Sequence, residues 1–462
     1  MLKNKQINYQ NYAYCISKYF DKSSNSICLI AKDSFESKYI YNELCLLMDK
    51  ELISYFPEND ILPYDHFSIP EKITKERFKI INENKKTKHI LISSVKNLFE
   101  KFPNRHFYKS RENFNLGDKL STENLTKIIE SLNYQKKVNI ENINEYSVRG
   151  GITDIYSPMY KNPLRIEIFD EQIESIRFFD VESQLSIKKL DKFSLSKGSF
   201  FNLDDNKISM FIDRWRDYFV NEDERYCSIF QEIKNFKNPE GVEVYFPLFF
   251  NETYSFKELF CEYDYIKCDE LIDEVGNYEL LINERFEDET NDSNRPLIKP
   301  SDLFVNSDDI FEFISSIHTL ETDEINFKYN SFKELEESLL SKVIDKKVVI
   351  ITSIPSELEK LKVKYSTKAS VINHINEIHK NISIMYGEIV RPMHVLDKNI
   401  LIIHKEFVNK STYKIQVSNR QTIKKERLYD LFDKKDFVIH EDYGLGIYLS
   451  LIHISEPTRP DE

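Results

Sequence analysis

Two arginines and a phenylalanine in residues 146–181 form the pattern with the clearest chemical meaning. Arg149 directly precedes the pair Gly150–Gly151, and Arg165 and Phe169 lie four residues apart in a segment that alternates apolar and polar residues. Because successive side chains of a strand point to opposite faces, residues four apart share a face. Arginine and aromatic side chains are enriched at the energetic centres of protein interfaces. The pattern therefore predicts a protein-binding surface and not a catalytic centre.

A purely structural interpretation of the same residues is also open. The arginines can form ion pairs on the sheet surface, while Phe169 is buried in the core. The nearby carboxylates are Glu167, Asp170, Glu171 and Glu174. Because ion pairs between exposed side chains are common and contribute little to stability, spacing alone favours this interpretation.

No other sequence pattern specifies a nucleotide, catalytic or metal site. The phosphate loop GxxxxGK[ST] is absent and Gly117 is the first glycine of the chain, which excludes nucleotide hydrolysis by the first segment. His374 and His379 are five residues apart, whereas an HExxH site needs four, so a solvated helix is the simpler explanation. The six cysteines are scattered without a CxxC, as expected of reduced thiols. We expect no enzyme activity, no metal and no cofactor in this chain.

The composition predicts a globular, cytoplasmic protein. Among 462 residues, 64 Lys and Arg stand against 77 Asp and Glu, a net charge of −13. Dedicated nucleic-acid binders usually carry a basic excess, so avid non-specific DNA binding is not expected. No apolar run reaches the roughly 18 residues of a membrane span. The first residues also lack the apolar core of a signal peptide.

The elements that must position these residues follow from hydrophobic patterning. Residues 1–116 alternate strands and helices as in a parallel α/β sheet. Strands are expected at 26–32, 52–57 and 89–95, and a helix capped by Asp33 or Ser34 at 33–50. Residues 117–196 alternate apolar and polar residues between turns, which predicts a small antiparallel β module. Residues 197–330 return to mixed α/β, and their acidic run 283–296 is expected to be a solvated loop.

The last third of the chain contains a second α/β pattern. Residues 331–410 predict a βαβ-like unit, with helices at 331–342 and 356–365 and strands at 346–353 and 399–407. Residues 411–430 are polar and basic and predict a linker. From 431 a new β module begins, with Gly444 and Gly446 expected at a turn.

Several segments, in order, resemble one known family. The stretches VRGGITDIYSP and LRIEIFDEQIESIRFFDVESQ resemble the second domain of the transcription-repair coupling factors, the Mfd family, and a similar domain occurs in the excision-nuclease subunit UvrB. YFPENDILPYDHFS and HILISSVKNLF resemble the first domain, and NRPLIKPSDLF resembles the end of that split domain. DFVIHEDYGLGIY resembles the opening of the RNA polymerase interaction domain, although Ile447 stands where the family commonly has Arg. The resemblance covers residues 5–451.

The resemblance implies a domain order. It implies a UvrB-like α/β domain that lacks a Walker A motif and is split into domain 1a (1–116) and domain 1b (197–330) by the inserted, mostly β domain 2 (117–196). It further implies a small α/β domain 3 (331–410), a linker (411–430), the truncated start of a CarD-like Tudor module (431–451) and a non-native tail (452–462).

The resemblance also implies function. The family recognises stalled RNA polymerase, displaces it by ATP-driven translocation on DNA, and recruits UvrA for nucleotide excision repair. Domain 2 is implied to bind UvrA through Arg149, Arg165 and Phe169, and a C-terminal domain masks this surface in the resting protein. The polymerase β subunit is implied to bind the C-terminal module, while DNA, ATP and Mg²⁺ belong to motor domains beyond this chain. The alternative, a UvrB-type protein that binds damaged DNA, is disfavoured because the Walker A motif and the Tyr-rich hairpin are absent.

Overall fold

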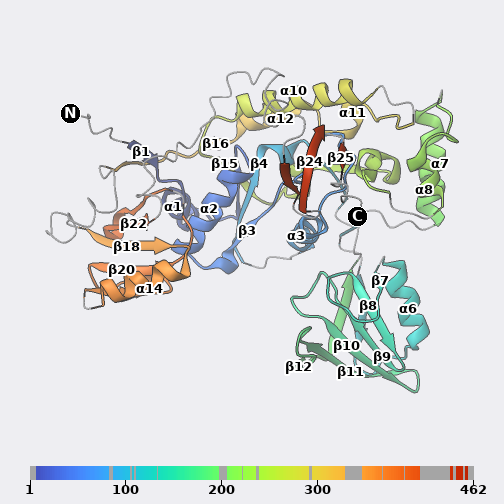
Figure 1. Cartoon of the computed structure of the whole chain (residues 1–462), viewed down its shortest axis with the longest axis horizontal. Coiled ribbons are helices and arrows are strands. Elements are labelled where there is room, and N and C mark those ends of the chain that lie inside the picture. The colour runs from blue at the N-terminus through green and yellow to red at the C-terminus, as the bar shows by residue number, and fades with distance from the viewer. Residues whose placement is uncertain are drawn as a thin grey trace, which may run out of the picture. The chain divides into compact units, whose positions relative to one another are not determined.

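The structure, a computed structural model, describes most of the chain. It covers residues 7–82, 87–104, 107–108, 111–132, 134–196, 205–220, 222–235, 239–290, 294–327, 346–366, 368–389, 391–405, 437–440, 444–450 and 453–455, and every statement below concerns these residues. The described residues form a mixed α/β architecture with several separate sheets, which confirms the predicted α/β class (Figure 1).

A five-stranded parallel sheet contains strands that come before and after the β module of residues 117–196 in the sequence. Its order is β16-β15-β2-β4-β3. The strands are β2 (Ile27–Ala31), β3 (Ile53–Tyr55), β4 (Ile90–Ser94), β15 (Asp264–Lys267) and β16 (His318–Thr319). All five residues of β2 and of β4 are buried, as expected of a parallel sheet covered on both faces. We call the part of the structure built on this sheet the split α/β domain.

Helices and short strands complete the split α/β domain. The helices are α1 (Tyr12–Lys22), α2 (Ser34–Leu47), η1 (Lys50–Leu52), α3 (Glu71–Asn82), α4 (Val95–Leu98), α7 (Asp205–Tyr218), α8 (Ser228–Lys234), η2 (Val242–Phe249), α9 (Phe256–Leu259), α10 (Ile272–Glu289), α11 (Pro300–Leu303) and α12 (Ser307–Ser316). The outlying strands β1 (Ile7–Gln10) and β17 (Glu324–Phe327) pair, as do β5 (Lys101–Pro103) and β14 (Thr253–Ser255). The expected loop at 283–296 is wrong in its first half, because α10 continues to Glu289 and buries Val275 and Ile282 on one side.

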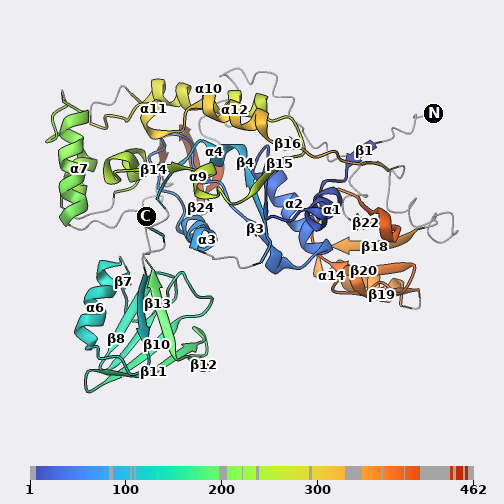
Figure 2. The ribbon, with the colours of Figure 1, turned by 180° about the vertical axis from the view of Figure 1, so that it is seen from behind.

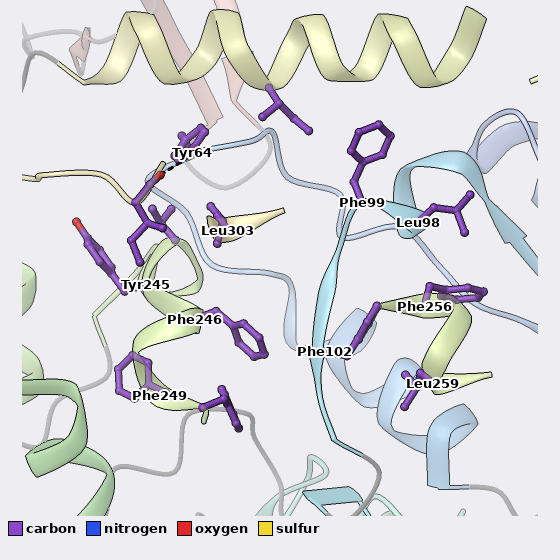
Figure 3. Packing of buried hydrophobic residues seen from close by; sticks show 14 of the residues in the cluster. Tyr64, Leu98, Phe99, Phe102, Tyr245, Phe246, Phe249, Phe256, Leu259 and Leu303 are labelled. Carbon is purple, nitrogen blue, oxygen red and sulfur yellow. Dashed lines mark hydrogen bonds between the residues drawn. The ribbon is translucent and has the colours of Figure 1, made fainter. Parts of the chain in front are cut away.

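Aromatic rings fill the core of the split α/β domain. Trp215 of α7, the single tryptophan, is 1% exposed, and its ring centroid lies 4.5 Å from Phe219 and 5.2 Å from Tyr245. Figure 3 shows Tyr245, on the 3-10 helix η2, in the same cluster as Tyr64. Two segments that carry the family resemblance meet here, because Arg295 donates to the carbonyls of Tyr64 and Asp65 at 3.1 and 2.6 Å.

The β module is a six-stranded sheet with one covered face (Figure 2). Its order is β12-β11-β10-β9-β8-β7, with β7 (Gln135–Lys136), β8 (Glu145–Arg149), β9 (Ile152–Ile155), β10 (Leu164–Phe169), β11 (Gln172–Phe179) and β12 (Ser186–Lys189). Helix α6 (Thr122–Ser131) and the pair β6 (Arg111–Asn115) and β13 (Lys192–Ser196) contribute to its core. The pairing of β6 with β13 places the start of the module before the predicted boundary at 117, because β6 belongs to it.

A second α/β sheet lies near the end of the described chain. Its order is β19-β20-β18-β22-β21, with β18 (Lys347–Thr352), β19 (Ala369–Val371), β20 (Ile382–Tyr386), β21 (Met393–Val395) and β22 (Ile400–His404). Helix α14 (Pro355–Lys364) and the turns η3 (Ile375–Glu377) and η4 (Leu396–Lys398) connect the strands. The expected helix around His374 and His379 is wrong, because this stretch forms only the short turn η3. We call residues 346–404 the small α/β domain.

The last described strands form an antiparallel sheet of their own. They are β23 (Phe437–His440), β24 (Gly444–Ser450) and β25 (His453–Ser455). The expected turn at Gly444 and Gly446 is wrong, because Gly444 pairs with His440 and Gly446 with Val438 inside the strands. Residues 453–455 of the expected non-native tail pair with β24. The predicted helix 331–342 and linker 411–430 lie outside the described residues. None of the helices in the described part of the chain has the length and the run of apolar residues that a membrane span needs.

Candidate functional site

The two faces of the β module differ in what covers them. Leu164, Ile166 and Ile168 of β10 are buried against the module's core. The alternate residues of β10, Arg165, Glu167 and Phe169, point away from it, as the alternation predicts. With their cross-strand neighbours they form a surface that we call the outer face, made of Arg149, Ile152, Asp154, Arg165, Glu167, Phe169 and Arg177.

The two glycines set the geometry at one end of the outer face. Gly150 has φ +61°, the left-handed conformation that a tight turn between β8 and β9 requires. A Cβ on Gly151 would lie 2.5 Å from the carbonyl oxygen of Ile168, so only glycine permits this close approach to β10. The amide of Ile168 donates to the carbonyl of Gly151 at 2.8 Å. The turn that follows Arg149 is therefore held beside the end of the strand that carries Phe169.

Asp154 is the residue that organises the two arginines. Its side chain is only 3% exposed, yet both carboxylate oxygens accept from Arg165, from Nε at 2.7 Å and from Nη2 at 2.9 Å. Nη2 of Arg149 lies 3.6 Å from the same carboxylate. Sequence reasoning missed Asp154. A two-residue turn at Gly150–Gly151 would have indicated it, because that register places Asp154 and Arg149 on one face.

The guanidinium of Arg165 contacts Gln184 and Phe179 in addition to Asp154. Nη2 also donates to Oε1 of Gln184 at 2.8 Å, and the guanidinium carbon lies 4.1 Å from the ring centroid of Phe179. The hydrogen bond with Asp154 is the main reason that the pKa of Arg165 is raised. The predicted ion pairing of this arginine occurs, but its partner is Asp154 and none of the four carboxylates considered. The side chain of Arg165 remains 16% exposed.

Phe169 ends β10 and faces outward. It is 70% exposed, so the interpretation that placed it in the core is wrong. Asp170 and Glu171, at the turn to β11, have φ of +49° and +60°. Ile152 adds apolar surface on the outer face. Together with Arg149 on the same face, this exposed ring gives the mixture of arginine and aromatic side chains that is enriched at protein interfaces.

A second ion pair, more exposed than the first, completes the outer face. Nη2 of Arg177 lies 2.5 Å from Oε1 of Glu167, and this hydrogen bond is the main cause of the lowered pKa of Glu167. Glu167 is 37% exposed, in contrast to Asp154. Arg149 is the most exposed of the three arginines, at 54%. The outer face thus offers an accessible cation and an aromatic ring beside arginines that are already paired.

The split α/β domain contains a cavity of about 120 Å³. Its walls include Tyr64, Phe102 and Phe246, and Figure 3 shows these rings close by. Two charged residues on its wall, Arg77 and Glu100, pair with each other at 2.6 Å. This arrangement offers no nucleophile beside a base. Among the described residues, no group of three or more acidic, His or Cys side chains is placed to hold a metal ion.

A family model matches the region that contains the outer face, and curated relatives match most of the chain. Residues 113–201 match the UvrB interaction domain family. The chain is 26% identical over 309 residues to the transcription-repair-coupling factor of Escherichia coli K12, which covers 65% of this chain and 26% of that protein. It is 23% identical over 471 residues to the same-named protein of Rickettsia bellii, covering 95% of this chain and 41% of that protein. The chain therefore spans less than half the length of these relatives.

Proposed function

We propose that this chain, whose predicted resemblance to transcription-repair coupling factors is confirmed by relatives that cover up to 97% of it, is the UvrA-recruiting part of such a factor. Its role is then to bring UvrA to RNA polymerase stalled at DNA damage, in nucleotide excision repair. The outer face of the β module is the surface that binds UvrA.

The observation that carries this proposal is the preorganised outer face within the matched residues 113–201. Asp154 holds Arg165, and the close approach at Gly151 holds the turn beside Arg149. Side chains that are ordered before binding lose less entropy when a partner docks. Phe169 then supplies an apolar anchor, and the exposed guanidinium of Arg149 supplies hydrogen bonds to carboxylates of the partner.

The geometry refines the roles of the three predicted residues. Arg149 and Phe169 are the accessible ones, and we assign them direct contact with UvrA. Arg165 has Nε and Nη2 committed to Asp154 and Gln184. It therefore acts mainly as a brace that supports the face and presents only the edge of its guanidinium.

The remaining activities belong, in this proposal, to the whole protein. The module that begins near residue 431 contributes to binding of the polymerase β subunit. In the remaining length of such a factor, motor domains bind ATP with Mg²⁺ and upstream DNA. These domains displace the polymerase. A C-terminal domain covers the outer face until the motor engages, so that exposure of the face acts as the switch.

Binding of purified UvrA to the full chain tests the proposal. Wild type is expected to bind with micromolar affinity or better, and Arg149→Ala combined with Phe169→Ala is expected to abolish binding. Phe35→Ala is the matched control, because Phe35 of α2 is 69% exposed and lies outside the β module. No binding by folded wild type would refute the proposal. Salt-dependent binding of damaged DNA in its place would favour the UvrB-type alternative.

A further inference from the structure

The carboxyl ends of β2 and β15 are the place where a parallel α/β sheet usually holds a ligand. Ligands of such sheets bind outside the carboxyl ends of the strands, and phosphates sit at the N-terminus of the following helix. Here β2 ends at Ala31 and α2 begins at Ser34, so the N-terminus of α2 occupies that position.

Carboxylates of the chain itself already occupy this helix N-terminus. Oδ1 of Asp33, the N-cap, accepts from the amide of Glu36 at 2.8 Å. Oε2 of Glu36 accepts from the amide of Lys32 at 3.2 Å. One first-turn amide of α2 and one amide of the preceding loop are therefore already bonded to carboxylates, and two carboxylates at this position repel a further anion. The site has the charge that a cation requires.

Arg391 of the small α/β domain supplies that cation. Its Nη2 lies 3.6 Å from Oε1 of Glu36, and its guanidinium carbon lies 5.3 Å from the ring centroid of Tyr12. The hydroxyl of Tyr12 donates to Asp269, which follows β15, at 2.6 and 2.7 Å. The backbone amide of Arg391 also donates to the buried carboxyl of Glu43. The guanidinium is thus surrounded by residues from α1 and α2 of the split α/β domain.

Contacts around Arg391 bind the small α/β domain along α1. Asn11 exchanges two hydrogen bonds with the backbone of His394, at 2.7 and 3.3 Å. Lys18 pairs with Asp397 at 2.7 Å, and the hydroxyl of Tyr14 accepts from the amide of Asp397. The two domains also share one apolar core, to which Ile16 of α1 and Ile402 of β22 contribute. In both views of the ribbon, α1 and α2 lie beside β18 and β22 (Figures 1 and 2).

We propose that the ligand position of the split α/β domain is a guanidinium-binding site, and that the small α/β domain is its intramolecular ligand through Arg391. Carboxylates take the place of a phosphate at the N-terminus of α2, and the guanidinium of Arg391 neutralises them.

Hydrogen exchange of the full chain, with and without Arg391→Ala, tests the proposal. Loss of a largely buried cation from its carboxylates should speed exchange in α1 and in residues 391–398 by about tenfold or more. Propylguanidinium, which replaces the missing group, should slow this exchange again at on the order of 10 mM by mass action. Sodium chloride at equal ionic strength should not. Exchange in β8–β10 serves as the internal reference for correct folding.

Two further samples make the outcome decisive. Arg216→Ala removes an arginine paired with Glu224 on the surface of the same split α/β domain, and it should leave exchange in α1 unchanged. Arg391→Lys, which keeps the charge but loses the planar group, should fall between wild type and Arg391→Ala. Unchanged exchange in Arg391→Ala, or equal rescue by sodium chloride, would overturn the proposal. Slowing by ATP or inorganic phosphate in the place of propylguanidinium would also overturn it.

Discussion

Arg165 and Asp154 face each other across β10 and β9 and share two hydrogen bonds, of 2.7 and 2.9 Å. The carboxylate is buried on a surface that also carries the exposed side chains of Arg149 and Phe169. Because Arg149 approaches the same carboxylate, one buried acidic residue orders two arginines that come from different strands. The outer face of the β module is therefore built around a residue that is itself almost fully buried.

Asp154→Asn is expected to weaken UvrA binding although the side chain is 3% exposed. Removing one member of a buried ion pair typically destabilises by about 3–5 kcal/mol, and here it also frees both arginines. Hydrogen exchange in β8–β10 and UvrA affinity measure the two effects. Glu167→Gln is the control, because the Glu167–Arg177 pair is more exposed and should contribute about 1 kcal/mol or less. Equal effects of the two variants would contradict the central role of Asp154.

Phe169→Ala should reduce UvrA affinity without loss of stability. A ring that is 70% exposed contributes little to the core, whereas truncation of an interface anchor typically costs about 2 kcal/mol or more, which is roughly a thirtyfold change in Kd. Titration of UvrA and thermal unfolding separate the two. Phe35→Ala, with 69% exposure, should change neither. A fall in stability with normal affinity would return Phe169 to a structural role.

Gly151→Ala should be more disruptive than Gly150→Ala. An added Cβ at Gly151 would meet the carbonyl oxygen of Ile168 at 2.5 Å, and this backbone atom has no rotamer with which to move away. At Gly150 the space is open, and only the left-handed φ of +61° is strained, by about 1–2 kcal/mol. Hydrogen exchange across β8–β10 is the measurement. The opposite ranking would show that the turn, and not the close approach, shapes this end of the outer face.

Glu43→Gln should change how stability depends on pH. Burial raises the pKa of Glu43 to about 7. The charge of Glu36 also raises this pKa, whereas Arg391 lowers it. The folded chain therefore binds more protons than the unfolded chain between pH 4.5, the ordinary pKa of the group, and about pH 7. The free energy of unfolding should fall as pH rises through this window, by up to about 3 kcal/mol, and level off above it.

Urea unfolding followed by Trp215 fluorescence reports on the split α/β domain, because Trp215 lies in its core. The comparison of wild type with Glu43→Gln cancels the other groups that titrate in the same range, among them Glu36 and Glu243, whose pKa values are also raised by burial. Parallel pH profiles of the two proteins would show that Glu43 does not ionise in this window.

Strong local patterns were sufficient for much of the fold. The apolar runs at 26–32, 89–95 and 346–353 became the buried strands β2, β4 and β18, and Asp33 caps α2. The loop predicted at 283–296 was wrong in its first half because a few buried positions, such as Val275 and Ile282, are enough to hold helix α10 in place. The other face of the helix can then be polar. The turn predicted at Gly444 and Gly446 was wrong because composition does not show whether a glycine lies in a turn or in the strand beside it.

The sequence by itself determined which residues could share the outer face. Alternation along β10 places Arg165 and Phe169 on one side because strand geometry has a period of two. Only the tertiary structure decided that Asp154 is buried between two arginines and that Arg391 reaches Glu36 and Tyr12. These contacts join residues from different strands or domains. Their partners depend on register and packing, which no local pattern of residues encodes.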